Sequence, residues 1–363
     1  MGKQRRPPWW WTAVRQVVAV ALLVTLPAGA AVAGPSSSPA PAAGTPVCQV
    51  RDSRLTEISG MVATDTGFVM VNDSADEESR RRVFFLDNHC RVVRTVRYPS
   101  RPRDTEDLAV AADGTIWIAD IGDNDRSRET VAVWTLPKGA DRPVLHRLTY
   151  PDGPHDAEAL LLTADGRPLI VTKQGGAAGI YTPTRDPVPG GTVPMARRGQ
   201  VDLPGTDTAN PFGFLGRAVV TGAAAAPDGR RVVLRTYADA FEFDVADGDV
   251  VAALTTGEPR VVALPDEPQG ESVTYTRDGR FLLTVSETAD QPAGTRPTVL
   301  RYPTPPLPTG TPRPAAGVTG SPTATGPSRR RDFGDALGAL ALVGVGLIGV
   351  GLLGAARSRR ARR

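Results

Sequence analysis

Cysteine and histidine are scarce in this sequence, which contains two cysteines and three histidines among 363 residues. The spacing of Cys48 and Cys90 fits neither a C-x-x-C redox motif nor a four-ligand zinc site. An even cysteine count in an oxidising compartment favours one disulfide between them, with two separate buried thiols as the alternative. The scarcity of nitrogen and sulfur ligands leaves oxygen ligands for any metal that the chain binds.

Several enzyme motifs are also missing. The sequence has no P-loop and no dinucleotide-binding fingerprint. Ser59 and Ser272 are not part of a G-x-S-x-G nucleophile elbow. The 34 prolines and 38 glycines favour many turns over long soluble helices.

Positive charge is scarce in the middle of the chain, although the formal net charge is +3. Residues 34–328 contain 30 basic and 37 acidic residues, a net charge of −7, because many of the arginines gather at the two ends. Nucleic acid requires a basic surface, so an acidic body of this kind excludes it as a partner.

The two ends predict secretion and a membrane anchor. Residues 1–33 combine a basic start, an apolar run and an A-x-A cleavage site that ends at Ala33, as in a signal peptide. Residues 34–46 are a flexible lead-in rich in proline, serine and alanine.

Residues 305–332 form a Pro/Thr/Gly-rich stalk. The segment 333–356 contains an uncharged run of 21 residues from 336 to 356, long enough for a transmembrane helix. Residues 357–363 hold five arginines and remain cytoplasmic by the positive-inside rule. We therefore expect a single-pass cell-membrane protein with an extracellular N-terminal domain and a short cytoplasmic tail.

Residues 47–304 repeat one pattern at intervals of roughly 50 residues. A polar residue, usually acidic, opens a short apolar strand, a turn follows, and a second strand ends in polar residues. The copies begin at Glu57, Asp104, Glu158, Thr221 and Glu271. Repeated short strands are typical of propeller blades, so we expect an all-β propeller of about five four-stranded blades.

The second copy predicts four strands, at residues 107–111, 115–120, 131–136 and 146–150. The fifth copy is one strand short. Residues 47–51 can supply that strand and close the ring, which removes an exposed edge. The stretch 183–213 is either a long loop or part of a sixth blade.

The repeats place polar residues on one rim. Glu106, Glu158 and Glu271 each precede the glycine of the following turn by eight residues. The next strand runs back antiparallel, so its polar end returns to the same face. We predict a metal site from the acids of this rim. The set is Glu57, Asp73, Glu106, Asp107, Asp120, Asp123, Glu158, Glu271 and Glu287.

Carboxylates gathered around one axis repel one another and must be neutralised. The basic residues Arg103, Lys173 and Arg235 are candidates for this role and for ligand binding, and a bound Ca²⁺ ion is a second possibility because it prefers oxygen ligands. As an alternative, the acids cap strand ends and loop amides. His155 and Glu158 are candidates for general acid–base catalysis, with an ordinary hydrogen-bonded histidine as the alternative.

The motifs E-x-S-G, D-x-E-D-x-A, A-D-I-G-D-N, D-x-E-A-L and Q-G-E-S resemble those of a family of secreted bacterial β-propellers of uncharacterised function, typical of high-GC Gram-positive bacteria. The resemblance covers roughly residues 47–303. More distantly, the chain is similar to phytase-like and esterase-like propellers. That similarity implies calcium binding by acids at the mouth and phosphate binding by Lys173 and Arg235. The acids implied are Glu106, Asp107, Asp120, Asp123 and Glu158.

Two functions remain open at this point. The first is a non-enzymatic binding or interaction module, a monomeric ectodomain that recognises a small ligand or a cell-surface protein. The alternative is a Ca²⁺-dependent hydrolase of phosphoesters or other esters.

Overall fold

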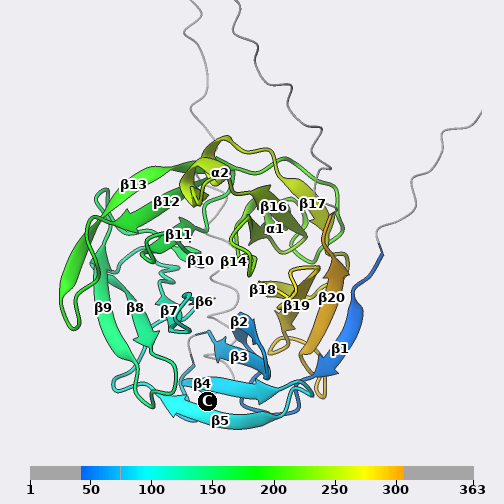
Figure 1. Cartoon of the computed structure of the whole chain (residues 1–363). Helices are drawn as coiled ribbons and strands as arrows, with labels where there is room; N and C mark the ends of the chain where they lie inside the picture. Colours follow the sequence, from blue (N-terminus) through cyan, green and yellow to red (C-terminus); the bar gives the residue numbers. More distant parts are fainter. Residues whose placement is uncertain (1–41, 74, 306–363) are drawn as a thin grey trace, which may run out of the picture. The chain divides into compact units, whose positions relative to one another are not determined.

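The computed structural model describes residues 42–73 and 75–305, which form a propeller-like all-β fold (Figure 1). The chain builds successive groups of four antiparallel strands. The first group is β2 (Ile58–Thr64), β3 (Gly67–Asn72), β4 (Arg82–Asp87) and β5 (Val92–Arg97). The second is β6 (Asp107–Val110), β7 (Ile116–Asp120), β8 (Val131–Leu136) and β9 (Val144–Thr149).

The third group is β10 (Ala157–Leu162), β11 (Pro168–Thr172), β12 (Ala177–Pro183) and β13 (Thr192–Asp202). Its outer strand β13 pairs in parallel with β9, which joins the second and third groups into one eight-stranded sheet. The stretch 183–213, predicted as either a long loop or part of a sixth blade, contributes a strand to this sheet. This stretch provides β13 and then a loop that leads into helix α1 (Gly213–Ala218).

The fourth group is β14 (Gly222–Ala225), β15 (Arg231–Arg235), β16 (Asp239–Asp244) and β17 (Arg260–Ala263), with helix α2 (Val250–Thr256) before its last strand. The remaining sheet contains β18 (Gln269–Tyr275), β19 (Phe281–Glu287), β20 (Thr298–Pro303) and β1 (Thr45–Gln49). The first strands of the groups contact one another in cyclic order, β2 with β6, β6 with β10, β10 with β14, β14 with β18 and β18 with β2.

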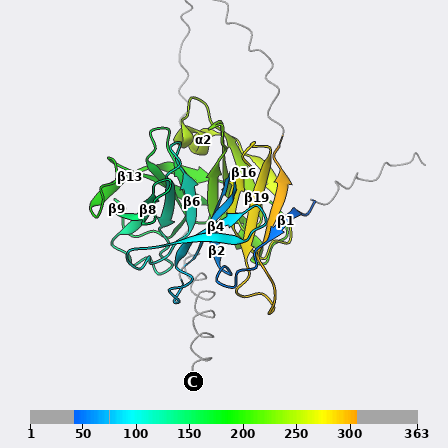
Figure 2. The same cartoon turned by 60° about the horizontal axis from the view of Figure 1, so that its bottom comes forward.

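Strand β1 closes the fold from the opposite end of the chain, as the sequence predicts, although it begins two residues earlier. It pairs antiparallel with β20, so that Thr45 lies opposite Arg301, and both views show it along that outer strand (Figures 1 and 2). Cys48 of β1 and Cys90 of the β4–β5 turn form the predicted disulfide. The bond fastens the last sheet to the first.

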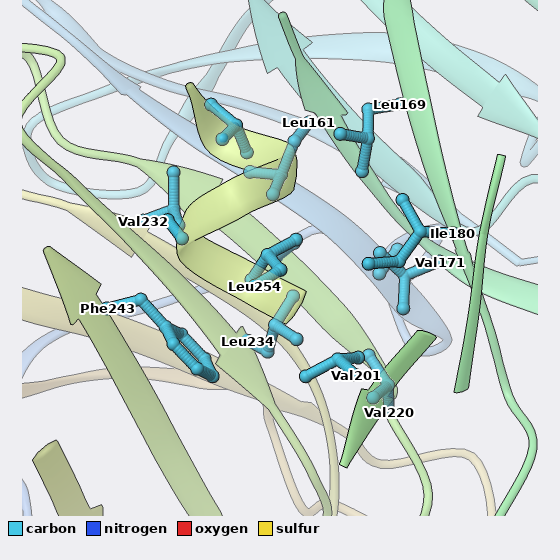
Figure 3. Close-up of a cluster of buried hydrophobic side chains, with 14 of the residues drawn as sticks. Leu161, Leu169, Val171, Ile180, Val201, Val220, Val232, Leu234, Phe243 and Leu254 are labelled. Carbon is cyan, nitrogen blue, oxygen red and sulfur yellow. The ribbon is translucent and has the colours of Figure 1, made fainter. Parts of the chain in front are cut away.

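The core fills the spaces between neighbouring sheets, because strand side chains alternate between two faces that are both covered. Figure 3 shows the cluster between the third and fourth groups, where Ile180, Leu234 and Phe243 are almost completely buried. Leu254 of α2 packs into the same cluster.

The predicted signal peptide, stalk, transmembrane helix and tail lie outside the described residues. Within 42–73 and 75–305, none of the helices has the length and apolarity needed to cross a bilayer.

Candidate functional site

The start of each first strand and the end of the second strand of the same group lie together, and carboxylates gather there. We call this set of residues the acidic mouth. Its members are Glu57, Asp73, Asp104, Glu106, Glu158, Glu271 and Glu287.

Three of these carboxylates could share one cation. Asp73, Asp104 and Glu106 each offer an oxygen, and the three oxygens lie within 4.8 Å of one another. The Ser59 hydroxyl donates to the Thr105 carbonyl oxygen at 2.7 Å, which links the first group to the segment that carries Asp104 and Glu106. Asp104 is absent from the predicted set, although the run of acids in DTED was the signal that could have included it.

The carboxylate of Glu106 lies so close to the backbone of residue 122 that only glycine fits there. A Cβ atom on Gly122 would be 2.0 Å from Oε1 of Glu106 and 2.6 Å from Oδ2 of Asp104. The glycine of the ADIGDN motif therefore lets the loop after β7 pass directly against these two carboxylates.

Three further glutamates of the mouth have unsatisfied oxygens. Glu158, Glu271 and Glu287 are more than nine-tenths buried, and each has one carboxylate oxygen without a hydrogen-bond partner. The amide of Gln269 donates to the other oxygens of Glu271 (3.2 Å) and Glu287 (2.7 Å). A buried acceptor left unpaired is costly, so these oxygens are suited to a proton or a bound cation.

Burial and crowding shift the titration of these groups. Burial, reinforced by the negative charge of Asp73 and Glu158, raises the pKa of Glu106 well above its usual range. Burial also raises the pKa of Glu287, with Glu271 adding to the effect. Glu106 and Glu287 therefore retain their protons to a higher pH than exposed glutamates do.

Two basic residues partly neutralise the mouth. The Lys173 ammonium forms an ion pair with Oε1 of Glu158 and lies 5.5 Å from the centre of the Tyr237 ring. Burial nevertheless raises the pKa of Glu158 to about 8, opposed by Lys173. Arg80, which the sequence did not indicate, pairs with Glu57 at 2.7 Å.

The other predicted basic residues do not form a ligand site with Lys173. Arg235 is fully buried, where it pairs with Glu267 at 2.5 Å and donates to the Ser272 carbonyl oxygen at 2.7 Å. Arg103 is exposed, and its backbone N–H donates to the Asp120 carboxylate.

Asp120 and Asp123 hold the loop after β7. Asp120 accepts hydrogen bonds from the Asp104 amide (3.0 Å), the Arg128 guanidinium (3.0 Å) and the Trp134 indole (3.2 Å). Asp123 accepts from the backbone amides of residues 127 and 128. Both follow the alternative in which acids satisfy loop amides, and they position the segment that carries Asp104.

Asp107 connects three first strands. Its completely buried carboxylate accepts backbone N–H bonds from Leu108 (2.8 Å), Leu160 of β10 (2.8 Å) and Ala223 of β14 (3.1 Å). These contacts give Asp107 a structural role, apart from the three-carboxylate group.

His155 and Glu158 have different hydrogen-bond partners. Nε2 of His155 lies 2.9 Å from Oδ1 of Asp152 and 3.1 Å from the Tyr181 hydroxyl, whereas Glu158 bonds to Lys173. This corresponds to the alternative of a hydrogen-bonded histidine.

Comparison with known proteins gives structural similarity alone. No protein-family model matches the chain, and no curated protein matches its sequence. Solved structures similar to it include virginiamycin B lyase from Staphylococcus aureus, with 10% identity over 71% of this chain and 73% of that one and a TM-score of 0.35.

Two others are a gluconolactonase from Xanthomonas campestris and a luciferin-regenerating enzyme. The gluconolactonase has 16% identity over 65% of this chain and 68% of its own, with a TM-score of 0.37. The luciferin-regenerating enzyme has 10% identity over 67% of this chain and 76% of its own, with a TM-score of 0.38.

Proposed function

We propose that the chain is a five-bladed, membrane-anchored extracytoplasmic β-propeller that acts as a binding module through its acidic mouth, with a Ca²⁺ ion held by Asp73, Asp104 and Glu106. The blade number rests on the cyclic contacts of β2, β6, β10, β14 and β18. The secretion signal and the anchor rest on the sequence at residues 1–33 and 333–356.

The observation that carries the cation proposal is the three-carboxylate group, supported by the buried glutamates around it. Oxygen ligands from two partly exposed carboxylates and a buried one suit Ca²⁺, which accepts varied geometries and ligand numbers. A bound cation would neutralise part of the mutual repulsion of the mouth and leave coordination positions for a ligand.

The positions of His155 and Arg235 favour binding over hydrolysis, because neither side chain is available to act on a substrate. His155 is engaged by Asp152 and Tyr181, and Arg235 is enclosed in an internal ion pair. Lys173 remains at the mouth, where it can orient a ligand beside the cation.

Melting curves in EGTA and in millimolar Ca²⁺ test the proposal. A ligand that binds only the folded state stabilises it by about 2.7 kcal/mol at a hundredfold excess over its Kd, so we expect a clear calcium-dependent rise in Tm. Equal Tm values in EGTA and Ca²⁺ would contradict the cation site. A rise that Mg²⁺ reproduces at the same concentration would contradict selectivity for Ca²⁺.

A further inference from the structure

A groove lies on the face of the fold opposite the acidic mouth. One wall is the turn between β10 and β11, at the end of β10 that is far from Glu158, and another is α2 with the turn before it. Strands β12 and β13 contribute further residues, and Figure 1 shows α2 beside β13. The groove has a volume of about 490 Å³, which is within the range of small-molecule sites. We call it the α2 groove.

The α2 groove contains two opposite charges that are not paired with each other. Arg198 of β13 and Asp247 of the turn before α2 both line it, and neither side chain has a partner among the described residues. Their charged atoms are therefore more than 4.0 Å apart. The other charged groups of the groove are engaged, since Arg167 pairs with Asp165 at 2.6 Å and Asp249 accepts a backbone N–H of α2 at 2.9 Å.

An irregularity of β13 places Arg198 in the groove. Ile180 of β12 pairs with Gly199 of β13, and the next residue of β12, Tyr181, pairs with Arg197. Arg198 is therefore the extra residue of a β-bulge. Because bulges change the direction in which the side chains of a strand point, the local structure of β13 determines the position of this guanidinium.

The remaining lining consists of one buried hydroxyl and apolar surface. Thr182 of β12 is 5% exposed, and its hydroxyl has no hydrogen-bond partner among the described residues. Ala164 and Val251 line the groove from its two walls. A small number of polar groups on an apolar lining is typical of a site that fixes the orientation of a small ligand.

The charges of the α2 groove exclude several kinds of ligand. In the part of the chain that the structure describes, the three carboxylates close enough to share a metal ion are at the acidic mouth, so the aspartates of the groove do not select a metal. A polyanion would meet three carboxylates against two guanidinium groups. An apolar ligand would cover Arg198 and Asp247 without pairing either charge, which is unfavourable.

We propose that the α2 groove binds a small zwitterion, an amino acid or a short peptide, whose carboxylate pairs with Arg198 and whose ammonium group pairs with Asp247. The planar guanidinium matches a carboxylate with two parallel hydrogen bonds. The apolar part of the ligand contacts Ala164 and Val251, and the Thr182 hydroxyl supplies a further hydrogen bond. This second site goes beyond the proposed function of the acidic mouth and does not depend on it.

Saturation-transfer NMR titrations of the full-length chain test the proposal. They are carried out in EGTA, so that the result is independent of a cation at the mouth. The probes are leucine and the dipeptide alanyl-leucine, which distinguish a free amino acid from a peptide. Two further probes are the same dipeptide with an acetylated amino group and with an amidated carboxyl group, each of which lacks one of the two charges.

We expect saturable binding of at least one zwitterion, and the tighter of the two identifies the source of the ligand. Arg198→Gln and Asp247→Asn should each weaken its binding by about fivefold, as for an ion pair at an exposed site. Arg198→Gln should not change the affinity for the amidated dipeptide, and Asp247→Asn should not change that for the acetylated one. The matched controls Arg142→Gln and Asp125→Asn remove exposed charges outside the groove and should have no effect.

Three results would overturn the proposal. They are the absence of saturable binding of both zwitterions, equal affinities for the zwitterionic and the blocked dipeptides, and unchanged zwitterion binding in both groove variants. Zwitterion binding without any effect of calcium on the Tm would contradict the proposed cation at the mouth and leave the α2 groove supported.

Discussion

Asp107 is the residue whose removal should loosen the inner strands most, because one carboxylate accepts amides from β6, β10 and β14. In Asp107→Asn an N–H₂ group replaces one carboxylate oxygen and faces backbone donors. We expect the free energy of unfolding to fall by about 1–3 kcal/mol for each buried donor left unpaired, measured by urea denaturation.

Asp125→Asn provides the matched control, since Asp125 is exposed in the loop after β7. It removes the same charge and should change the free energy of unfolding little. Equal effects of the two substitutions would show that net charge, and not the shared carboxylate, explains the loss of stability.

The raised pKa of Glu158 predicts that the stability of the folded chain depends on pH. Its pKa is raised by burial from 4.5 to about 8, so between these values the folded chain holds a proton that the unfolded chain releases. The stability from this proton is fully present below pH 4.5 and is lost as the pH rises through about 8. In EGTA the Tm should therefore fall as the pH rises from about 4.5 to about 8 and level off above that value.

Glu158→Gln removes the titrating group and should flatten this part of the Tm profile. A variant profile parallel to that of the wild type would assign the pH dependence to other carboxylates, such as Glu106 or Glu287.

At the residue scale, the repeat alignment predicted which glutamates gather but not which neighbours face away from them. Successive strand side chains point to opposite faces. Lys173 follows the turn Gly166 by seven residues and joins the mouth, whereas Arg235 follows Gly229 by six and is buried. A shift of one residue separates Lys173, a partly exposed lysine at the mouth, from Arg235, which is in a fully buried ion pair, and the sequence alone does not show which face is covered.

At the scale of elements, β1 and its disulfide close the propeller. Cys48 and Cys90 are 42 residues apart, and chain-entropy reasoning gives about 4 kcal/mol for a loop of that size. Replacing both cysteines by serine should lower the free energy of unfolding by up to that amount, measured in EGTA by denaturant titration.

Reduction of the wild type should reproduce the effect of the double substitution, and the reductant should not change the stability of the double variant. A serine variant as stable as the oxidised wild type would mean that the pairing of β1 with β20 suffices to close the fold.

The strands of the second group were predicted within two residues, because alternating apolar residues and Asp-Gly turns fix both their faces and their ends. The structure of residues 183–213 was not predicted. Their strand β13 is long and pairs in parallel with β9, and the local sequence carries no information on a partner strand in another group. The course of the chain after β13 was not predicted either, because it depends on hydrogen bonds from Thr206 and Thr208 to Asp239 of β16.

At the scale of the whole molecule, the repeated sequence pattern brings polar residues from every group to one site. Each group begins its first strand beside the same centre, so residues that are distant in sequence meet there. The pattern predicted this convergence. It did not indicate Asp104 and Arg80, since their positions depend on loops whose course is set by the Asp120 and Asp123 hydrogen bonds and by packing.

Calcium titration of the EGTA-stripped full-length chain by isothermal calorimetry tests the central claim most directly. We predict saturable binding by the wild type, at least about tenfold weaker binding by the Asp73→Asn/Glu106→Gln double variant because two charged ligands are removed, and unchanged binding by Asp125→Asn. Wild-type affinity in the double variant, or no calcium binding by the wild type, would contradict the account.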